Sequence, residues 1–162
     1  MPYLKPFDAS THFDSPVGVI SLYSVGDAIV FLEMGGAPAP ISGKSAVLKT
    51  ARQQLERYFA GKSRVLDFKV RADGTEFQEA VWREIATIPF GETKTYVDIA
   101  RAIGKPQASR AVGGAVGSNP VPLVIGCHRV LGAGGKITGY SGGDGLPTKR
   151  KLLALEGITA KE

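Results

Sequence analysis

The chain has 162 residues with a formal net charge of +5, and 43% of its residues are hydrophobic. This composition is typical of a globular protein with one or two domains. A single cysteine, Cys127, excludes an internal disulfide. One cysteine and two histidines in the whole chain are too few ligands to favour a structural zinc site. No apolar run reaches the roughly 18 to 20 residues of a membrane span, and the start, MPYLKPFDAS, lacks the pattern of a secretory signal. We therefore expect a cytoplasmic protein, associated with the nucleoid or, in a eukaryote, nuclear.

The N-terminal part begins with the pattern of a β-hairpin followed by a helix. Residues 18–23 and 28–33 are rich in β-branched, leucine and aromatic side chains, and the residues between them have turn chemistry. Residues 45–59 place apolar side chains near helical spacing, and Gly61 stands just beyond them as a stop signal.

A further strand and a change of pattern set the expected domain boundary. Residues 65–70 alternate roughly as a half-buried strand does, and the residues after them break the alternation. From Thr75 onward the sequence reads as short helices and loops. We therefore expect an α+β fold with two domains, a small N-terminal one over residues 1–74 and a C-terminal one over residues 75–162.

Two capping boxes predict the first helices of the C-terminal part, one beginning at Thr75 and one at Thr95. Gly104 stands where the second of these helices should end. After a tight connection, residues 107–116 predict another helix, so that the segment has the helix-turn-helix pattern.

The helix predicted over residues 107–116 consists mostly of small residues, which permit close approach to another surface. Composition alone favours a neighbouring helix as that surface. Residues 101–151, however, hold eight Lys and Arg against one acidic residue, whereas residues 1–74 hold nine against seven. Such local basic charge favours nucleic acid, with Arg110, the only charge on this helix, entering a groove.

Residues 127–129 place a thiol, an imidazole and a guanidinium side by side, in Cys127, His128 and Arg129. A lone buried cysteine is usually inert packing. A neighbouring base and positive charge instead favour a thiolate nucleophile. Successive side chains of a strand point to opposite faces, so cooperation between Cys127 and His128 requires either a turn or a water relay.

Glu156 is the best candidate for a carboxylate behind His128, because such a base normally has an acid that fixes its tautomer. It ends a helix predicted over residues 148–155, where the helix dipole opposes an acid. The basic residues 149–151 lie at the equally unfavourable N-terminal end of that helix. Exposure to solvent would explain both placements. The functional alternatives are contact of residues 149–151 with phosphates and contact of Glu156 with His128.

At this point the sequence resembles a known family. Residues 110–130 (RAVGGAVGSNPVPLVIGCHRV), followed by GYSGG at 139–143 and LLALEG at 152–157, closely resemble the O6-alkylguanine-DNA alkyltransferases. The resemblance covers residues 75–157. It implies a small ribonuclease-H-like N-terminal domain and a mostly helical C-terminal domain with a winged-helix-like helix-turn-helix.

The resemblance implies direct reversal of DNA damage. Cys127 would accept the alkyl group from O6 of guanine, or O4 of thymine, in one irreversible displacement that consumes the protein. The expected partner is double-stranded DNA bearing O6-alkylguanine, and no cofactor or metal is implied. We expect a monomer that can assemble cooperatively on DNA.

The resemblance also assigns roles to individual residues. Beside Cys127, it gives catalytic roles to a water-mediated base, its orienting carboxylate, a tyrosine that donates to the guanine ring and an asparagine that braces the turn: His128, Glu156, Tyr96 and Asn119. Arg110 matches the arginine that replaces the flipped nucleotide, and further DNA contacts are expected from Ala111, Gln107, Ser109, Thr95, Lys149 and Arg129. The residues expected to line the substrate pocket are Val116, Val130, Tyr140 and Ser141.

The sequence departs from the family pattern at Gly126, where the family has proline, and by the extra residues Asp144 and Gly145. Because glycine leaves the turn less preorganised, we expect slower alkyl transfer than in a Gly126→Pro variant. Two other classes stay open: a non-catalytic protein that binds alkylguanine and flags it for other repair factors, and a helix-turn-helix regulator. The regulator is disfavoured because only Arg110 and Gln107 could read base edges.

Overall fold

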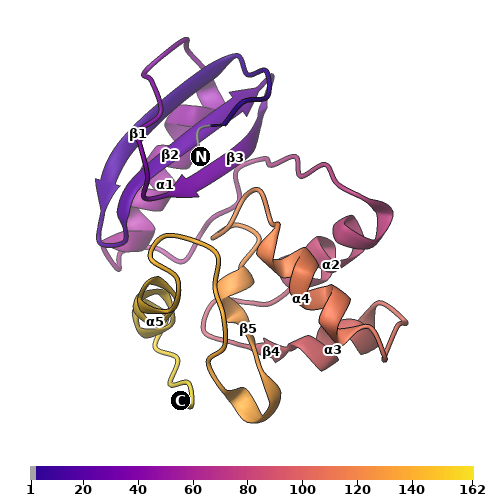
Figure 1. Ribbon diagram of the computed structural model, residues 1–162. Coiled ribbons are helices and arrows are strands. Elements are labelled where there is room, and N and C mark those ends of the chain that lie inside the picture. Colours follow the sequence, from indigo (N-terminus) through magenta and orange to yellow (C-terminus); the bar gives the residue numbers. More distant parts are fainter. Residues whose placement is uncertain (1–2) are drawn as a thin grey trace.

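The computed structural model describes residues 3–162 and places a sheet and one helix at one end of the molecule and the remaining helices at the other (Figure 1). The sheet is antiparallel, in the order β1 (Ala9–Ser15), β2 (Gly18–Val25) and β3 (Ala28–Met34). Helix α1 (Ala46–Phe59) follows it, with Ser45 as its N-cap. The predicted hairpin and helix are thus confirmed, whereas β1 is an additional strand.

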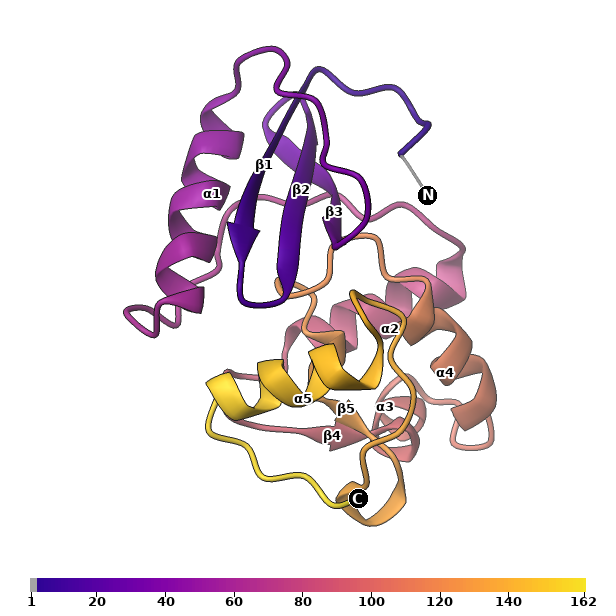
Figure 2. The same cartoon turned by 60° about the vertical axis from the view of Figure 1, so that its left-hand side comes forward.

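Both faces of the sheet are covered. Helix α1 lies along one face of the sheet (Figure 2). Alternate residues of β2 such as Ile20 and Leu22 belong to the main core, to which α1 contributes Leu55 and Tyr58. On the other face, Tyr23 packs within a smaller aromatic cluster with side chains of the N-terminal segment. The sheet therefore has little free surface on either side.

The prediction of a strand over residues 65–70 is wrong. Only Val70 pairs with the sheet, through a single bridge to Ile29. Before it, the N–H of Asp67 donates to the side chain of Gln54 and that of Val65 donates to Ser63, so these donors are satisfied outside any ladder. Leu66, Phe68 and Val70 face the core, whereas Val65 is 52% exposed, so the alternation marks a buried face without forming a strand.

The capping boxes predicted at Thr75 and Thr95 are both confirmed. They begin α2 (Glu76–Ala86) and α3 (Tyr96–Ala102), and in each the threonine hydroxyl accepts from the third helical N–H while that residue's side chain accepts in return. Gly104 has a φ of +78°, the left-handed conformation expected just after a helix end. Helix α4 (Ser109–Gly117) then packs against α2 and α3.

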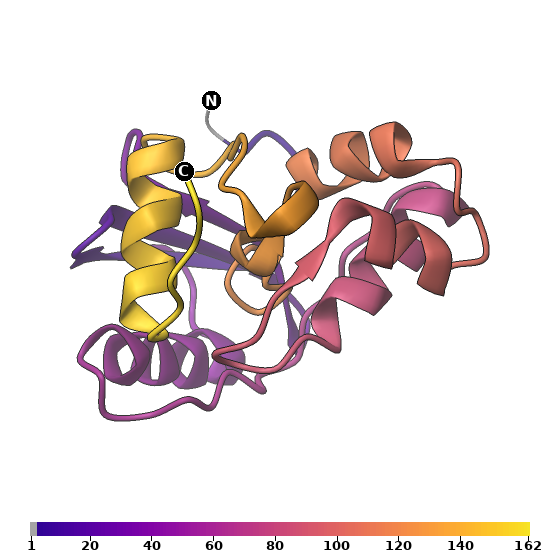
Figure 3. The same ribbon diagram turned by 90° about the horizontal axis from the view of Figure 1, so that it is seen from below.

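The last part of the chain returns across the C-terminal helices. A 3-10 turn, η1 (Cys127–Arg129), leads into β5 (Val130–Leu131), which pairs in parallel with β4 (Lys94–Thr95). A second 3-10 turn, η2 (Ala133–Gly135), and a loop precede α5 (Leu146–Leu155), which lies beside the C-terminal segment (Figure 3). The β4–β5 pair fixes the start of α3 relative to the turn that carries Cys127.

The two ends of the molecule are joined by one continuous core and by hydrogen bonds between them. The N–H of Leu32 in β3 donates to the carbonyl of Pro120, 2.9 Å away, just ahead of the cysteine segment. Lys151 of α5 donates to the carbonyl of Pro16 in the β1–β2 turn. Among the helices of residues 3–162, none combines the length and apolarity needed to cross a membrane.

Candidate active site

Cys127 lies at the wall of a pocket of about 1060 Å³ between the two ends of the molecule. The pocket is bounded by β3 and the residues after it, by the end of α4, and by the loop over residues 140–143. Cys127 is 4% exposed. A nucleophile held in this way is shielded from bulk water while its sulfur still faces a space large enough for a small molecule or a base.

The backbone turns at Cys127, which is one of the two possibilities that the sequence leaves open. The N–H of Cys127 donates to the carbonyl of Ile125 at 2.7 Å, and the N–H of Arg129 donates to that of Gly126 at 2.9 Å. His128 therefore does not continue a strand but turns into the interior, where it is fully buried.

Asn119 holds the loop that leads to this turn. Its Nδ2 donates to the carbonyl of Ile125 at 2.7 Å, and its Oδ1 accepts from the N–H of Val121 at 3.0 Å. Within the same loop, Leu123 has a φ of +79° and is 1% exposed, so its left-handed backbone is maintained by burial of the side chain. The loop is thus fixed from both sides before it reaches the cysteine.

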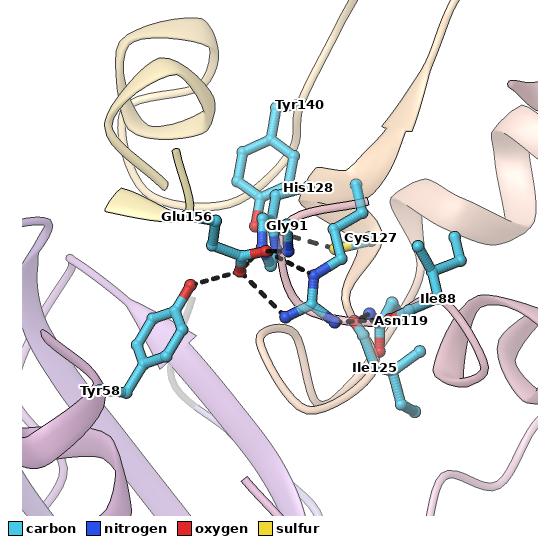
Figure 4. A network of polar contacts seen from close by, with 10 residues as sticks. Tyr58, Ile88, Gly91, Asn119, Ile125, Cys127, His128, Tyr140 and Glu156 are labelled. Atoms are coloured by element: carbon cyan, nitrogen blue, oxygen red, sulfur yellow. Dashed lines mark hydrogen bonds and ion pairs between the residues drawn. The ribbon is translucent and has the colours of Figure 1, made fainter. Parts of the chain in front are cut away.

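Behind the turn, the Glu156 carboxylate collects five hydrogen bonds from four residues within the part of the chain that the structure describes (Figure 4). Oε2 lies 2.6 Å from His128 Nε2 and accepts from the Tyr58 hydroxyl at 2.7 Å. Arg129 donates through Nε at 2.8 Å and Nη2 at 2.9 Å, and the N–H of Gly91 donates at 3.1 Å. The carboxylate therefore has its orientation fixed by the protein.

The pKa values of this network follow from burial and hydrogen bonding. Burial alone would raise the pKa of Glu156, but the donors from His128, Arg129 and Tyr58 outweigh it and hold the carboxyl pKa far below its usual range. Burial lowers the pKa of His128 despite the opposing effect of Glu156, so the resting imidazole is neutral. With its Nε2 proton directed to Glu156, Nδ1 is the acceptor nitrogen, and within residues 3–162 it has no hydrogen-bond partner.

The thiol of Cys127 is surrounded by groups that partly offset its burial. Burial raises the pKa of Cys127, whereas hydrogen bonding with Asn119 and Tyr140 and the charge of Lys149 lower it. Its Sγ lies 3.8 Å from the Tyr140 hydroxyl. The resting thiol is therefore protonated, and its reaction as a nucleophile requires a base to remove the proton.

Two family models match this chain, one for each end of the molecule. The model described as "6-O-methylguanine DNA methyltransferase, DNA binding domain" matches residues 76–158, and that described as "6-O-methylguanine DNA methyltransferase, ribonuclease-like domain" matches residues 10–72. The chain belongs to the 6-O-methylguanine DNA methyltransferase family.

Named members of this family are similar over nearly the whole chain. The methylated-DNA–protein-cysteine methyltransferase of Methanosarcina acetivorans is 44% identical over 151 residues, which cover 90% of this chain and 96% of the relative. That of Mycolicibacterium paratuberculosis is 44% identical over 153 residues, 88% of each chain. The crystal structure of Mycobacterium tuberculosis OGT in complex with DNA matches with a TM-score of 0.81 and 42% identity over 91% of both chains.

Of the four residues expected to line a substrate pocket, three lie at the pocket that Cys127 borders. Val116, Tyr140 and Ser141 line the pocket with Cys127, and the Ser141 hydroxyl donates to the carbonyl of Gly117 at the end of α4. Val130 is fully buried and does not line the pocket. Its carbonyl instead accepts a hydrogen bond from Lys149 at 2.7 Å.

Two residues expected to contact DNA lie in the interior instead. Arg129 is 8% exposed and uses its guanidinium on Glu156 and on the carbonyl of Ile88. Lys149 is 1% exposed, and burial lowers its pKa to about 8. Both side chains already donate to groups around the site, Arg129 to the Glu156 carboxylate and a carbonyl, and Lys149 to carbonyls. Neither is therefore placed to contact DNA phosphates.

The remaining expected DNA contacts surround α4. Arg110 and Ala111 are exposed on the helix, and Gln107 is exposed in the turn just before it. Ser109 and Thr95 are half-buried, and the Thr95 hydroxyl caps α3. The exposed face of α4 thus joins Arg110 to small residues, whereas its opposite side packs on α2 and α3.

Tyr96, at the start of α3, is half-buried next to α4, and its hydroxyl accepts from Thr138 at 3.3 Å. The sequence offered no signal for two partners of Glu156, Tyr58 and the N–H of Gly91. Tyr58 is 98 residues away along the chain and lies in the other half of the molecule, and only the folded structure reveals the contact.

Proposed function

We propose that this protein repairs O6-alkylguanine in double-stranded DNA by transferring the alkyl group irreversibly to Cys127. The observation that carries the proposal is the chain's only cysteine at the wall of a pocket, backed by a buried His128–Glu156 pair, in a member of this family. In the transfer, the bond between the alkyl carbon and O6 breaks as a bond from the carbon to sulfur forms. The guanine is restored, and the protein is spent.

The proton of the thiol leaves toward His128 in this proposal. The acceptor nitrogen Nδ1 faces away from Glu156, and a bridging water can connect it to Sγ. The Glu156 carboxylate then stabilises the imidazolium that forms, since it is already ionised and bonded to Nε2. Without that carboxylate, a cation would be created in a fully buried position.

Tyr96 supplies the proton donor on the other side of the reaction. Displaced guanine carries negative charge, and a phenol that donates a hydrogen bond to the ring helps to neutralise it. The Tyr96 hydroxyl accepts from Thr138, which leaves its own proton free to be directed elsewhere. Its position at the start of α3 is fixed by the pairing of β4 with β5, which also carries the chain away from Cys127.

For DNA engagement, we propose that α3 and α4 act as a winged-helix-like helix-turn-helix and that the division from the N-terminal domain falls near residue 74. The exposed small residues of α4 allow it to approach the duplex closely, and Arg110 replaces the nucleotide that is flipped into the pocket. Flipping costs a few kcal/mol, which the inserted side chain and the pocket contacts offset. Contacts with the backbone rather than with base edges suit a repair protein that must act at any sequence.

The product in DNA tests this proposal. A duplex with one O6-methylguanine is incubated with increasing amounts of protein, digested to nucleosides and separated by chromatography. We expect one guanine to be restored for each protein molecule added and none with Cys127→Ser. Tight binding of the methylated duplex with no restored guanine would support the alternative, a protein that binds the damage without repairing it.

A further inference from the structure

Tyr58 connects the N-terminal part of the molecule directly to the proposed proton path. It lies near the end of α1, is 1% exposed, and donates its hydroxyl to Glu156 Oε2 at 2.7 Å. Its ring is fixed edge-on to Phe59 and Phe90, with centroid distances of 5.3 and 6.1 Å. Figure 4 shows the hydroxyl pointing across the boundary between the two halves toward the carboxylate.

The oxygen that Tyr58 contacts is the one that serves His128. Oε2 also receives Nη2 of Arg129, whereas Oε1 receives Nε of Arg129 and the N–H of Gly91. The arginine and the backbone hold the carboxylate from one side, and the tyrosine holds it from the other. Loss of the hydroxyl would remove the donor on the tyrosine side of Oε2, so that the carboxylate can shift relative to the imidazole, while the contacts of Arg129 and His128 with it remain.

We propose that Tyr58 is a positioning residue for alkyl transfer, holding the Glu156 carboxylate in the orientation that supports His128. This inference rests on the proposed function, because His128 matters only if the thiol proton must be removed. It also gives the N-terminal part of the chain a direct role in the chemistry. A purely structural role would instead confine Tyr58 to packing between α1 and the segment around Phe90.

The test compares Tyr58→Phe with two matched variants of the full-length chain. Tyr23→Phe removes another buried hydroxyl from the same half of the molecule, outside the pocket and the Glu156 network. Phe59→Leu loosens the packing around the Tyr58 ring but keeps its hydroxyl. Single-turnover transfer is measured from a methylated duplex at increasing protein concentration, with the melting temperature of each variant.

We expect Tyr58→Phe to lower the maximal transfer rate about tenfold, the scale of a lost hydrogen bond to a charged group. The protein concentration that gives half of this rate should stay unchanged, because Tyr58 does not line the pocket and is not part of α4. Tyr23→Phe and Phe59→Leu should keep the wild-type rate, whatever their effect on the melting temperature.

The pH profile supplies a second readout. The charged or titratable groups facing Glu156 are His128 and Arg129 from η1 and Tyr58 from α1, and Lys149 of α5 acts on His128. Tyr58 donates to the ionised carboxylate and so favours that form. A Glu156 carboxylate with one donor fewer should stabilise protonated His128 more strongly, so the acid limb of the rate profile, where His128 takes up a proton and stops acting as a base, should move to higher pH.

Three results would overturn the inference: a Tyr58→Phe rate equal to wild type, an equal loss of rate in Phe59→Leu, or a lower rate with an unshifted acid limb. Failure of the proposed function is distinguishable, since the wild-type protein would then transfer no methyl group at any pH. A Tyr58→Phe chain that melts early yet shows both the reduced rate and the shifted limb below its melting temperature would still support the inference.

Discussion

At the scale of single residues, the account depends on an ionised carboxylate at the centre of the protein. Glu156 is 5% exposed, and Arg129, which bonds it through two nitrogens, is 8% exposed. A buried pair of this kind contributes modestly as a whole, but removal of one partner leaves the other charge unpaired and is strongly destabilising. The carboxylate therefore matters for folding as well as for the proton path.

We expect Glu156→Gln to lower the free energy of unfolding at neutral pH by about 3 to 5 kcal/mol, because it leaves the Arg129 charge buried without a counter-charge. The matched control is Glu162→Gln, which should leave the free energy of unfolding nearly unchanged, because its side chain and its partner Arg150 are exposed and their attraction is screened by solvent. Urea unfolding of both variants checks the difference. Equal losses would contradict the assignment of the buried network.

The pH dependence of this contribution has a defined sign. The folded pKa of Glu156 lies below its unfolded value, so its stabilising effect is fully present above the unfolded pKa and is lost as the pH falls through the folded one. The stability gap between wild type and Glu156→Gln should therefore narrow on acidification. Urea unfolding across the acid range measures this, and a gap that widens toward low pH would contradict it.

Gly126 provides a second test at this scale. Its φ of −71° suits proline, but a Cβ there would lie 2.9 Å from Arg129 Nη1. The guanidinium of Arg129 is held by Glu156 and by the carbonyl of Ile88, so it must shift by a few tenths of an ångström, which offsets part of the gain from a restricted φ. We expect Gly126→Pro to transfer at most about fivefold faster than wild type, as a conformational gain of about 0.4 to 1 kcal/mol allows.

Gly126→Ala serves as the control because it adds the Cβ without the ring. We expect it to transfer no faster than wild type in the same single-turnover assay. Equal rates for the glycine and proline proteins would show that preorganisation of this turn does not limit the reaction.

At the scale of secondary-structure elements, α4 carries the clearest mismatch between folding and function. Gly114 is exposed, and a Cβ built there meets no atom within 4 Å. A glycine inside a helix costs about 0.8 to 1 kcal/mol relative to alanine. A position that would gain stability from a side chain and yet lacks one is explained if DNA occupies the space beside it.

We expect Gly114→Leu to raise the melting temperature and to weaken binding to duplex DNA about tenfold, the cost of forcing a side chain into a close-packed contact. Ala154→Leu, on the exposed face of α5, makes a comparable change away from this helix and should leave DNA binding unaltered. Fluorescence anisotropy with a labelled duplex measures both. Unchanged affinity in Gly114→Leu would contradict the placement of α4 against DNA.

The elements that the sequence predicted are those with local signals. The boxes at Thr75 and Thr95 and the hairpin turn involve residues within four positions of one another, and each determines its own backbone. Strand β1 was missed because it is mostly polar, with Phe13 as its one large apolar side chain. The segment over residues 65–70 was misread because period-two alternation does not reveal whether a partner strand is in reach.

At the scale of the whole molecule, the site depends on contacts that no local pattern contains. The predicted association of Cys127, His128 and Glu156 came from chemistry and resemblance, and the structure brings the last two within 2.6 Å. The inward placement of Arg129 and Lys149 could not be predicted, since a basic residue near a basic surface ordinarily faces solvent. The Tyr58 contact joins segments that only the docking of the two halves brings together.

Alkylation should also affect the whole fold. The Cys127 sulfur lies 3.8 Å from the Tyr140 hydroxyl, so an added methyl group displaces that contact and crowds the pocket wall. We expect a loss of about 1 to 3 kcal/mol, with Tm falling about 2 to 4 °C for each kcal/mol in a chain of this size. Thermal unfolding before and after reaction checks this, and an unchanged Tm in fully alkylated protein would contradict it.

The most direct test of the central claim is the intact mass of the protein after incubation with a duplex that contains one O6-methylguanine. We predict a gain of one methyl group per protein molecule, located on Cys127 by peptide mapping and absent in Cys127→Ser. An unchanged mass with full retention of binding to the methylated duplex would contradict alkyl transfer to this cysteine.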